Sequence, residues 1–302
     1  MENPIYTYCT PTVVSGDREN VDVIAHELSH SYSGNLVTNA SWEHFWLNEG
    51  WTTYLERRLQ AAIHGAPHRD FSAIIGWKAL EDSVNQFGHE HDFTKLIPDL
   101  KGKDPDDAFS SIPYEKGYTF LSYLEAQVGK DKWNKYIPHY FTVFARRSID
   151  SYDFKANLLG YFSSDSAASA ALQAVDWDRW FYAPGLPPKP DFDTSLVDVC
   201  YALASKWETA DPKTFEPQTS DISDWRAKQI VVFLEKLQAL PEPLDKLLIQ
   251  KMGQAYGFAN GQNVEIVARY FKLALMAKDE NVLQPTAELL GRVGRMKFVR
   301  PL

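Results

Sequence analysis

The residues best suited to chemistry in this sequence form one short motif, His-Glu-Leu-Ser-His at positions 26–30. On a helix, residues four apart lie on the same face, so His26 and His30 would converge on one point. Two imidazoles at that separation suit a zinc ion, with Zn–N bonds of about 2.0–2.1 Å. Glu27 could reach a metal-bound water without being a ligand. The motif therefore predicts a metal-assisted hydrolase with Glu27 as its general base.

A third ligand is predicted downstream of this motif. Glu49 follows His30 after 18 further residues and lies in the run Asn-Glu-Gly at positions 48–50. On a helix it would share one face with Trp42, Phe45, Trp46, Thr53 and Glu56. A carboxylate on such an aromatic face needs a cation, which makes Glu49 the third ligand of a His₂Glu zinc site with one open position. The alternative is that it pairs with Arg57, Arg58 or Lys78.

These residues require two helices, which the sequence predicts at residues 21–32 and 42–63. Asp17 or Asn20 could cap the first helix, and Gly65 and Pro67 end the second. Further elements are expected along the first half of the chain. They are helices at residues 71–87, 114–128, 132–144 and 152–161, a strand at residues 5–10 and a long loop at residues 91–113.

A proline-rich stretch divides the chain into two predicted domains. Residues 183–191 contain four prolines, which is typical of a semi-rigid connector. We expect a catalytic domain at residues 1–183, a linker at 184–193 and a helical domain at 194–302. The last domain has amphipathic segments that start near Ser195, Asp224, Leu244, Val264 and Asn281. Such spacing is typical of stacked helical hairpins, so the expected fold class is mainly α, of the α+β kind.

Composition excludes several classes of protein. The chain has 302 residues, a formal net charge of −9 and 44% hydrophobic residues. It is therefore not intrinsically disordered, and its acidity disfavours a nucleic-acid partner. No apolar run is long enough to span a membrane. The two cysteines, Cys9 and Cys200, indicate a reducing compartment, so we expect a location in the cytoplasm, or in the cytoplasm and nucleus.

The sequence resembles the gluzincin aminopeptidases, in their leukotriene A4 hydrolase branch, from its first residue to its last. The resemblance rests on the zinc motif and on the segments Ser33-Gly-Asn-Leu-Val-Thr-Asn, Asn48-Glu-Gly, Pro113-Tyr-Glu-Lys-Gly, Pro184-Gly-Leu-Pro-Pro and Gly294-Arg-Met-Lys-Phe-Val-Arg-Pro-Leu. It implies a thermolysin-like zinc peptidase domain followed by an α-helical repeat domain of the armadillo or HEAT type. It also implies a β-rich domain upstream and further chain downstream, so this sequence is expected to be part of a longer protein.

The resemblance assigns roles to individual residues. His26, His30 and Glu49 match the zinc ligands of the family, which implies one Zn²⁺ per chain, and Glu27 matches its general base. Tyr114 matches the tyrosine that stabilises the oxyanion, where one donor to developing charge contributes about 2.7–4 kcal/mol. Without the resemblance, Tyr114 would be interpreted as a core tyrosine with a hydrogen-bonded hydroxyl.

Other matches concern the substrate. Glu2 matches the glutamate that holds the α-amine of a peptide, with an ordinary surface acid as the alternative. Asp106 matches the aspartate that directs water onto a lipid carbocation in leukotriene-forming members, with a solvated loop acid as the alternative. Arg295 and Lys297 match basic residues that bind the carboxylate of the substrate, and a basic helix end is the alternative.

Five further positions bear on the shape of the site. Trp42 and Phe45 match a wall of the substrate site and would otherwise be core residues. Glu56 is either a hydrogen-bond partner of a zinc-binding histidine or part of a surface salt bridge. Phe109 stands in place of a tyrosine that lines the lipid channel of the family, and Pro98 in place of an aliphatic residue. Both differences weigh against leukotriene synthesis as the physiological activity.

Three functions are therefore weighed. The first is a zinc aminopeptidase that removes the N-terminal residue from short peptides. The second adds hydrolysis of a lipid epoxide at the same site, for which Asp106 is the main indication. The third is an inactive or impaired chain, or a helical-repeat binding protein with a relict zinc site. Its signature would be a missing ligand or base. No nucleic acid, membrane span or protein partner is inferred.

Overall fold

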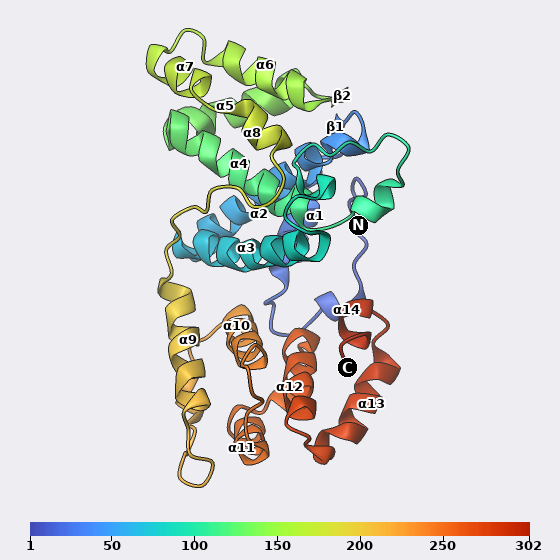
Figure 1. Ribbon diagram of the computed structural model, residues 1–302, viewed down its shortest axis with the longest axis vertical. Coiled ribbons are helices and arrows are strands. Elements are labelled where there is room, and N and C mark those ends of the chain that lie inside the picture. The colour runs from blue at the N-terminus through green and yellow to red at the C-terminus, as the bar shows by residue number, and fades with distance from the viewer. The chain divides into compact units, whose positions relative to one another are not determined.

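The computed structural model describes residues 1–302 and divides them into two compact units (Figure 1). The first unit comprises Met1–Tyr8 and Asp22–Asp193, and the second comprises Cys9–Val21 and Thr194–Leu302. Helices account for most of both units. The mainly α fold class predicted from the sequence is therefore confirmed.

This division differs from the predicted domains at residues 9–21, which the prediction had placed with the catalytic domain. In the structure, Asp17 Oδ2 accepts a hydrogen bond from Asn263 at 3.0 Å. Glu19 Oε2 accepts one from the backbone N–H of Ala227 at 3.1 Å. The predicted linker at residues 184–193 is grouped with the first unit. The hydrogen bonds of Asp17 and Glu19 join segments that are far apart in the sequence. A domain boundary inferred from the proline-rich stretch therefore cannot predict that residues 9–21 belong to the second unit.

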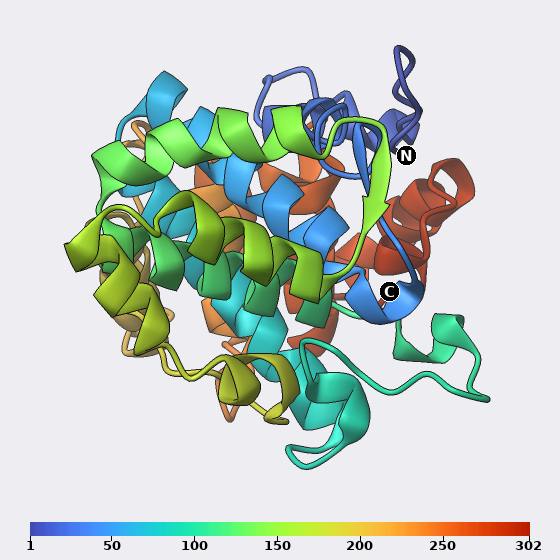
Figure 2. The ribbon, with the colours of Figure 1, turned by 90° about the horizontal axis from the view of Figure 1, so that it is seen from above.

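The first unit is built from eight helices and one pair of short strands. The helices are α1 (Val21–Ser29), α2 (Trp46–His64), α3 (Pro67–Phe87), α4 (Ile112–Val128), α5 (Lys130–Val143), α6 (Ser151–Tyr161), α7 (Ser166–Gln173) and α8 (Trp177–Tyr182). The strands, β1 (Val37–Asn39) and β2 (Arg147–Ile149), pair in parallel with Val37 opposite Arg147. Figure 2 shows β2 following α5 and lying alongside β1.

Glycine and proline explain the junction between α2 and α3. Gly65, with φ of +99°, ends α2, and Pro67 begins α3, because proline suits the first helical turn. The prediction had used Pro67 only as a helix end and started the next helix at residue 71. The predicted strand at residues 5–10 is wrong: this segment pairs with no strand, and Ile5 has φ of +72°.

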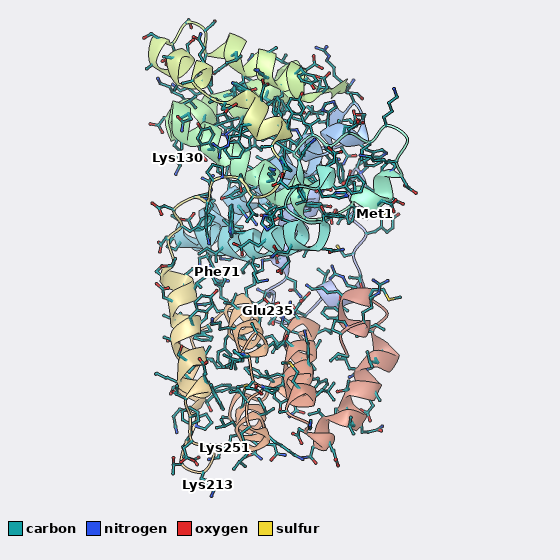
Figure 3. All side chains as sticks on the ribbon, viewed as in Figure 1. Met1, Phe71, Lys130, Lys213, Glu235 and Lys251 are labelled. Carbon is teal, nitrogen blue, oxygen red and sulfur yellow. The ribbon has the colours of Figure 1, made fainter.

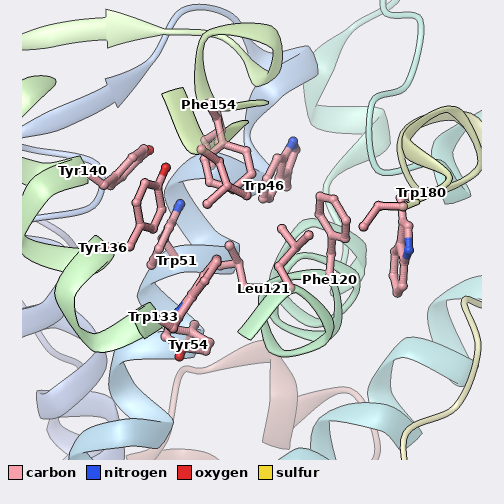
Figure 4. Close-up of a cluster of buried hydrophobic side chains, with 14 of the residues drawn as sticks. Trp46, Trp51, Tyr54, Phe120, Leu121, Trp133, Tyr136, Tyr140, Phe154 and Trp180 are labelled. Carbon is pink, nitrogen blue, oxygen red and sulfur yellow. The ribbon is translucent and has the colours of Figure 1, made fainter. Parts of the chain in front are cut away.

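Helices α2 and α4 form the centre of the first unit and cross closely at Gly50 and Gly117. A Cβ atom added to Gly50 would lie 2.8 Å from the Cα atom of Gly117, so only glycine allows this approach. Large aromatic side chains from several helices are buried together beside the crossing (Figure 4). They include Trp46, Trp51, Tyr54, Phe120, Trp133, Tyr136, Tyr140 and Phe154. Since each such ring buries about 150–250 Å², this cluster holds α2 firmly in the unit.

The second unit contains six helices. They are α9 (Ser195–Glu208), α10 (Ala227–Gln238), α11 (Lys246–Tyr256), α12 (Val264–Met276), α13 (Leu283–Arg292) and α14 (Met296–Val299). The five predicted helix starts lie within three residues of the first residues of α9 to α13. Helix α10 packs against both α9 and α12. Lys251 of α11 donates to the carbonyl of Phe215 at 2.7 Å and so holds the segment that follows α9.

The side chains of each unit fill the space between its helices (Figure 3). None of the helices combines the length and the apolar composition that crossing a membrane requires.

Candidate metal centre

Two helices bring three potential metal ligands together. His26 lies in α1, His30 directly follows that helix, and Glu49 lies in the first turn of α2. A hydrogen bond from the N–H of His30 to the carbonyl of His26, 3.1 Å long, keeps the two imidazoles one turn apart. Potential ligand atoms of the three side chains all lie within 4.8 Å of one another. Both His30 and Glu49 are buried.

The three ligand atoms form a nearly equilateral triangle. The Nε2 atoms of His26 and His30 are 3.2 Å apart. Glu49 Oε2 lies 3.3 Å from the first of these nitrogens and 3.4 Å from the second. Ligands of a tetrahedral zinc ion, each bound at about 2.0–2.1 Å, would lie about 3.3–3.4 Å apart. The spacing therefore fits three corners of a zinc site and leaves the fourth corner for another ligand.

Hydrogen bonds on the far side of each ring orient the two imidazoles. His26 Nδ1 lies 3.0 Å from Glu56 Oε2. His30 Nδ1 lies 2.9 Å from the carbonyl oxygen of Ser33 and 3.1 Å from Thr52 Oγ1. A proton on each Nδ1, donated to these acceptors, leaves both Nε2 lone pairs facing one shared point. Of the two alternatives for Glu56, the structure shows the contact with the histidine.

The charges of the site favour a cation. Burial opposes charge on His26, but hydrogen bonds to the carboxylates of Glu49 and Glu56 outweigh burial and raise the pKa of His26 to about 10. Burial likewise acts to raise the pKa of Glu49, but His26 and His30 lower it to about 2. The site thus attracts positive charge, which a proton or a metal ion can supply.

Glu27 lies beside the ligand set with one unused carboxylate oxygen. Its Oε1 atom is 2.9 Å from the α-amino nitrogen of Met1. Its Oε2 atom is buried and accepts no hydrogen bond from the protein. A buried polar atom without a partner is costly, and such atoms are found where a site has chemistry to do. This oxygen is therefore available to accept a proton.

Tyr114, in the first turn of α4, packs against His26. Its ring stacks on that of His26, with centroids 6.1 Å apart and an interplanar angle of 18°. Burial, the negative charge of Glu49 and a hydrogen bond to Glu49 raise the pKa of Tyr114 well above its usual range. The hydroxyl therefore stays protonated and can donate a hydrogen bond.

Glu2 also reaches this site. Its Oε2 atom lies 3.3 Å from His30 Nε2, and its Oε1 atom accepts a hydrogen bond from Asn48 Nδ2 at 3.1 Å. The backbone carbonyl of Glu2 accepts a further hydrogen bond from Asn35 Nδ2 at 2.7 Å. The structure therefore brings Glu2 together with the three candidate metal ligands.

Aromatic side chains adjoin Tyr114 on the outer side of the site. The rings of Phe45 and Phe109 each lie 6.3 Å from the ring of Tyr114, edge to face. The ring centroids of Trp42 and Phe45 are 5.2 Å apart, and Trp42 is 58% exposed. These rings therefore form an apolar wall that solvent can reach and not a closed core. Asp106 precedes Phe109 by three residues in the short helix Pro105–Ala108, and its side chain is exposed.

Arg295 and Lys297 lie in the second unit, where both face the carboxylate of Glu265. Lys297 Nζ is 2.8 Å from that carboxylate, and Arg295 Nη1 is 3.9 Å from it. Arg269 pairs with Glu265 as well, at 2.7 Å. Glu265 carries no local sequence signal and was not predicted. The binding of a substrate carboxylate by Arg295 and Lys297 stays a prediction.

The cations considered as alternative partners of Glu49 pair elsewhere. Arg57 lies beside Glu115, Arg58 beside Glu125 and Lys78 beside Asp82. Glu49 therefore has His26, His30 and Tyr114 as its side-chain partners. This alternative interpretation of Glu49 is excluded.

The sequence did not predict the structural roles of two supporting residues, Ser33 and Thr52. Ser33 Oγ donates to the carbonyls of Leu47 and Asn48, at 2.9 and 2.8 Å, and so ties the segment after α1 to the start of α2. Thr52, three residues after Glu49 on α2, contacts His30. Because Thr52 lies one helical turn after the candidate ligand Glu49, the sequence could have predicted that it lies near the site.

Comparison with known proteins agrees with this geometry. Residues 1–180 match the peptidase family M1 domain, and residues 225–302 match the family described as leukotriene A4 hydrolase, C-terminal. Two relatives are each 68% identical over 302 residues, which is 100% of this chain. One is a leukotriene A-4 hydrolase homolog of Botryotinia fuckeliana, of which the chain covers 46%, and the other is leucine aminopeptidase 2 of Sclerotinia sclerotiorum, of which it covers 49%.

A solved structure extends the comparison. Native leukotriene A4 hydrolase from Saccharomyces cerevisiae matches 100% of the chain with a TM-score of 0.92 and 43% sequence identity, and the chain covers 51% of it. The chain spans about half the length of the curated relatives it matches. The resemblance inferred from the motifs is thereby confirmed. Because the family model covers residues 1–180, which include all three candidate metal ligands, the chain belongs to peptidase family M1.

Proposed function

We propose that this protein is a zinc-dependent aminopeptidase that removes the N-terminal residue from short peptides. The observation that carries the proposal is the triangle of His26, His30 and Glu49, whose ligand atoms lie 3.2, 3.3 and 3.4 Å apart. The names of two relatives, leucine aminopeptidase 2 and leukotriene A-4 hydrolase homolog, support a hydrolase of this kind.

His26, His30 and Glu49 would hold one zinc ion, since their spacing and their lone pairs fit it. When bound, zinc acts as a Lewis acid toward a carbonyl oxygen and lowers the pKa of a coordinated water to about 7. The contacts of the two imidazoles with Glu56 and Ser33 keep the rings in the required tautomer and orientation. Such outer contacts typically raise metal affinity about 10–100-fold.

Glu27 would take the proton of the attacking water. It follows His26 directly, so its side chain leaves α1 in a different direction and is not among the candidate ligands. Its Oε2 atom has no donor from the protein and can accept that proton. General base catalysis by a positioned carboxylate contributes about 10²–10⁴-fold to the rate.

Tyr114 would stabilise the negative charge that develops on the carbonyl oxygen of the scissile bond. Its hydroxyl is protonated, and its ring is held against His26, so it can donate one hydrogen bond to that oxygen. Loss of one such donor typically lowers kcat by about 10²–10³-fold.

The remaining groups of the site favour a substrate with a free amine. The carboxylate of Glu2 is held beside His30 by Asn48, and it would attract the positively charged α-amine of a peptide. This attraction would restrict cleavage to the first peptide bond. Trp42 and Phe45 would line the space for the first side chain. For Arg295 and Lys297 we propose the role that the family resemblance implies, binding of the carboxylate of a short peptide.

The decisive experiment compares metal content with turnover. We expect about one zinc ion per chain in wild type and in Glu27→Gln, measured by mass spectrometry of the metal, as a mononuclear site requires. Glu27→Gln should lose at least about 100-fold in kcat on a leucine anilide. Glu90→Gln, at an exposed position outside the site, should behave as wild type.

Two outcomes would contradict the proposal. Wild-type protein without stoichiometric zinc would favour the alternative of a binding protein with a relict site. Retained turnover in zinc-loaded Glu27→Gln would remove Glu27 from its assigned role as general base.

A second activity, hydrolysis of a lipid epoxide at the same site, is proposed from Asp106, which matches the aspartate of leukotriene-forming members, whereas Phe109, in place of the family's tyrosine, weighs against it. The ring of Phe109 contacts Tyr114, so the segment that carries Asp106 adjoins the site. Asp106→Asn should abolish epoxide opening and leave peptide hydrolysis unchanged, whereas Asp107→Asn, beside it, should change neither activity. A wild-type protein that opens no lipid epoxide would exclude this second activity.

A further inference from the structure

An ion pair between the buried Arg57 of α2 and the partly buried Glu115 of α4 lies in the first unit. Arg57 Nη1 lies 2.8 Å from Glu115 Oε2, and Arg57 Nη2 lies 2.9 Å from Glu115 Oε1. The guanidinium and the carboxylate therefore meet through two parallel hydrogen bonds. Arg57 is only 3% exposed. A bidentate pair of this kind fixes both the distance and the angle between two side chains.

Further contacts fix the orientation of the Arg57 guanidinium in this ion pair. The Nε and Nη2 atoms of Arg57 donate to Ser72 Oγ and to the carbonyl of Ser72, each at 3.1 Å. The guanidinium also lies over the ring of Tyr118, at 4.2 Å from its centroid. Gly76 of α3 supplies the room for the pair. A Cβ atom added there would lie 2.1 Å from Glu115 Oε2 and 2.2 Å from Arg57 Nη2.

Lys116 and Gly117, which follow Glu115 in α4, are also held in place by contacts. Lys116 is buried, and its Nζ atom donates to three backbone carbonyls, at 2.8, 2.8 and 2.9 Å, those of Thr94, Ala183 and Gly185. Gly117 lies against Gly50, which directly follows the candidate ligand Glu49. The turn of α4 that carries Tyr114 is therefore held in register with the turn of α2 that carries Glu49.

We infer that Arg57 and Glu115 are positioning residues for the peptidase reaction, an inference that rests on the proposed function. Arg57 is buried and its hydrogen bonds go to Glu115 and Ser72, so we expect it to act on the reaction through Glu115 and not by touching the substrate. Glu115 directly follows Tyr114, so the ion pair sets the distance from the Tyr114 hydroxyl to the metal ligands. A misplacement of about 1 Å can cost about 100-fold in rate.

The test is a double-mutant cycle between Arg57 and Tyr114 in the zinc-loaded protein. We expect Arg57→Met to lower kcat at least about tenfold, with KM and zinc content within about twofold of wild type. In the Tyr114→Phe background, the same change should lower kcat by less than about twofold, because no hydroxyl is left to misplace. Equal losses in the two backgrounds would overturn the inference, since a purely structural role would act on both.

A second ion pair provides the matched control. Arg69 of α3 lies 2.6 Å from Glu125, which is in the last turn of α4, at the opposite end from Tyr114. Arg69→Met should lower the melting temperature but leave kcat within about twofold of wild type. A loss of kcat as large as that of Arg57→Met would overturn the inference.

Hydrogen exchange of the metal-free protein gives a readout that does not depend on activity. Arg57→Met should speed exchange in the first turn of α4, and Arg69→Met in its last turn. Because loss of Arg57 leaves a partly buried carboxylate unpaired, Glu115→Gln serves as a second variant that keeps the shape of the side chain without its charge. It should show the same pattern to a smaller extent. Unchanged exchange in the first turn in both variants would contradict the positioning role.

The proposed function and this inference fail in different ways. A wild-type protein without zinc or turnover refutes the proposed function. The positioning role alone is refuted by a different set of results. In that case the wild type binds zinc and is active, Tyr114→Phe loses much of its kcat, and Arg57→Met lowers kcat equally in the wild-type and Tyr114→Phe backgrounds.

Discussion

Gly50 of α2 and Gly117 of α4 lie in direct contact, and a Cβ atom added to either would be 2.8 Å from the Cα atom of the other. Glu49 directly precedes Gly50, and Tyr114 lies one turn before Gly117. The close approach of the two backbones therefore brings a candidate metal ligand and a proposed oxyanion donor together. Closely packed interiors respond to the addition of even one methyl group, so this contact is a sensitive point of the site.

We expect Gly117→Ala to destabilise the protein by about 1–3 kcal/mol, because the added methyl group forces α2 and α4 apart. The value of kcat should fall too, since the same displacement moves Tyr114 away from Glu49. Urea unfolding and steady-state kinetics measure the two effects. Gly160→Ala in α6 is the control: apart from the backbone of its own helix, no atom lies within 4 Å of its added Cβ, so it should be neutral or stabilise by up to about 1 kcal/mol. A Gly117→Ala variant as stable and active as wild type would show that the crossing relaxes freely.

Replacing Glu56 should weaken zinc binding without removing a ligand. Its Oε2 atom lies 3.0 Å from His26 Nδ1, and loss of such a partner typically costs about 10–100-fold in metal affinity. We expect Glu56→Ala to raise the zinc Kd by that factor and Glu56→Gln, which keeps a carbonyl acceptor, to raise it less. Competition with a chromophoric chelator measures both constants. Equal affinities in wild type and Glu56→Ala would mean that this hydrogen bond does not orient His26.

Lys116→Met should be among the most destabilising single changes in the first unit. Methionine would fill the space of the buried lysine but leave three carbonyl acceptors without a donor. Because each buried unpaired acceptor costs about 1–3 kcal/mol, we expect the free energy of unfolding to fall by at least about 3 kcal/mol. Lys132→Met, which removes a partly exposed ion pair with Asp165, should cost no more than about 1 kcal/mol. Similar losses in the two variants, measured by urea unfolding, would argue against this role of Lys116.

Removing the metal should lower the melting temperature of the protein. A ligand that binds only the native state stabilises it by about 4 kcal/mol when present at 1,000 times its Kd. Protein treated with a chelator should therefore melt several degrees below the zinc-loaded form, and added zinc should restore the original value. Glu49→Gln should show a smaller zinc-dependent shift, because one ligand is impaired. An identical melting temperature with and without zinc would count against a metal bound by His26, His30 and Glu49.

The ligand set could be predicted because its determinants are local. His26 and His30 are one helical turn apart, and the periodicity of a helix converts that spacing into a shared face. The same reasoning placed Glu49 and Glu56 on one face of α2, where the structure has them on the side of the histidines. The role of Tyr114 required the family resemblance, since a tyrosine in the first turn of a helix carries no mark of its own.

Contacts between distant segments could not be predicted in this way. Arg57 and Glu115 are 58 positions apart, and Lys297 and Glu265 are 32 positions apart, so no periodicity links either pair. The predicted strand at residues 5–10 failed for a related reason. A strand exists only beside a partner strand, and an alternation of residue types does not supply one.

The hydrogen bond between Asp17 and Asn263 joins positions that are 246 residues apart. During synthesis at about 5–20 residues per second, Asp17 leaves the ribosome roughly 10–50 s before Asn263. Throughout that interval residues 9–21 lack this native partner, although the helices of the first unit can already form. The second unit therefore reaches its final structure only after Asn263 has been made, and residues 9–21 gain this partner later than the helices of the first unit that follow them in the sequence can form.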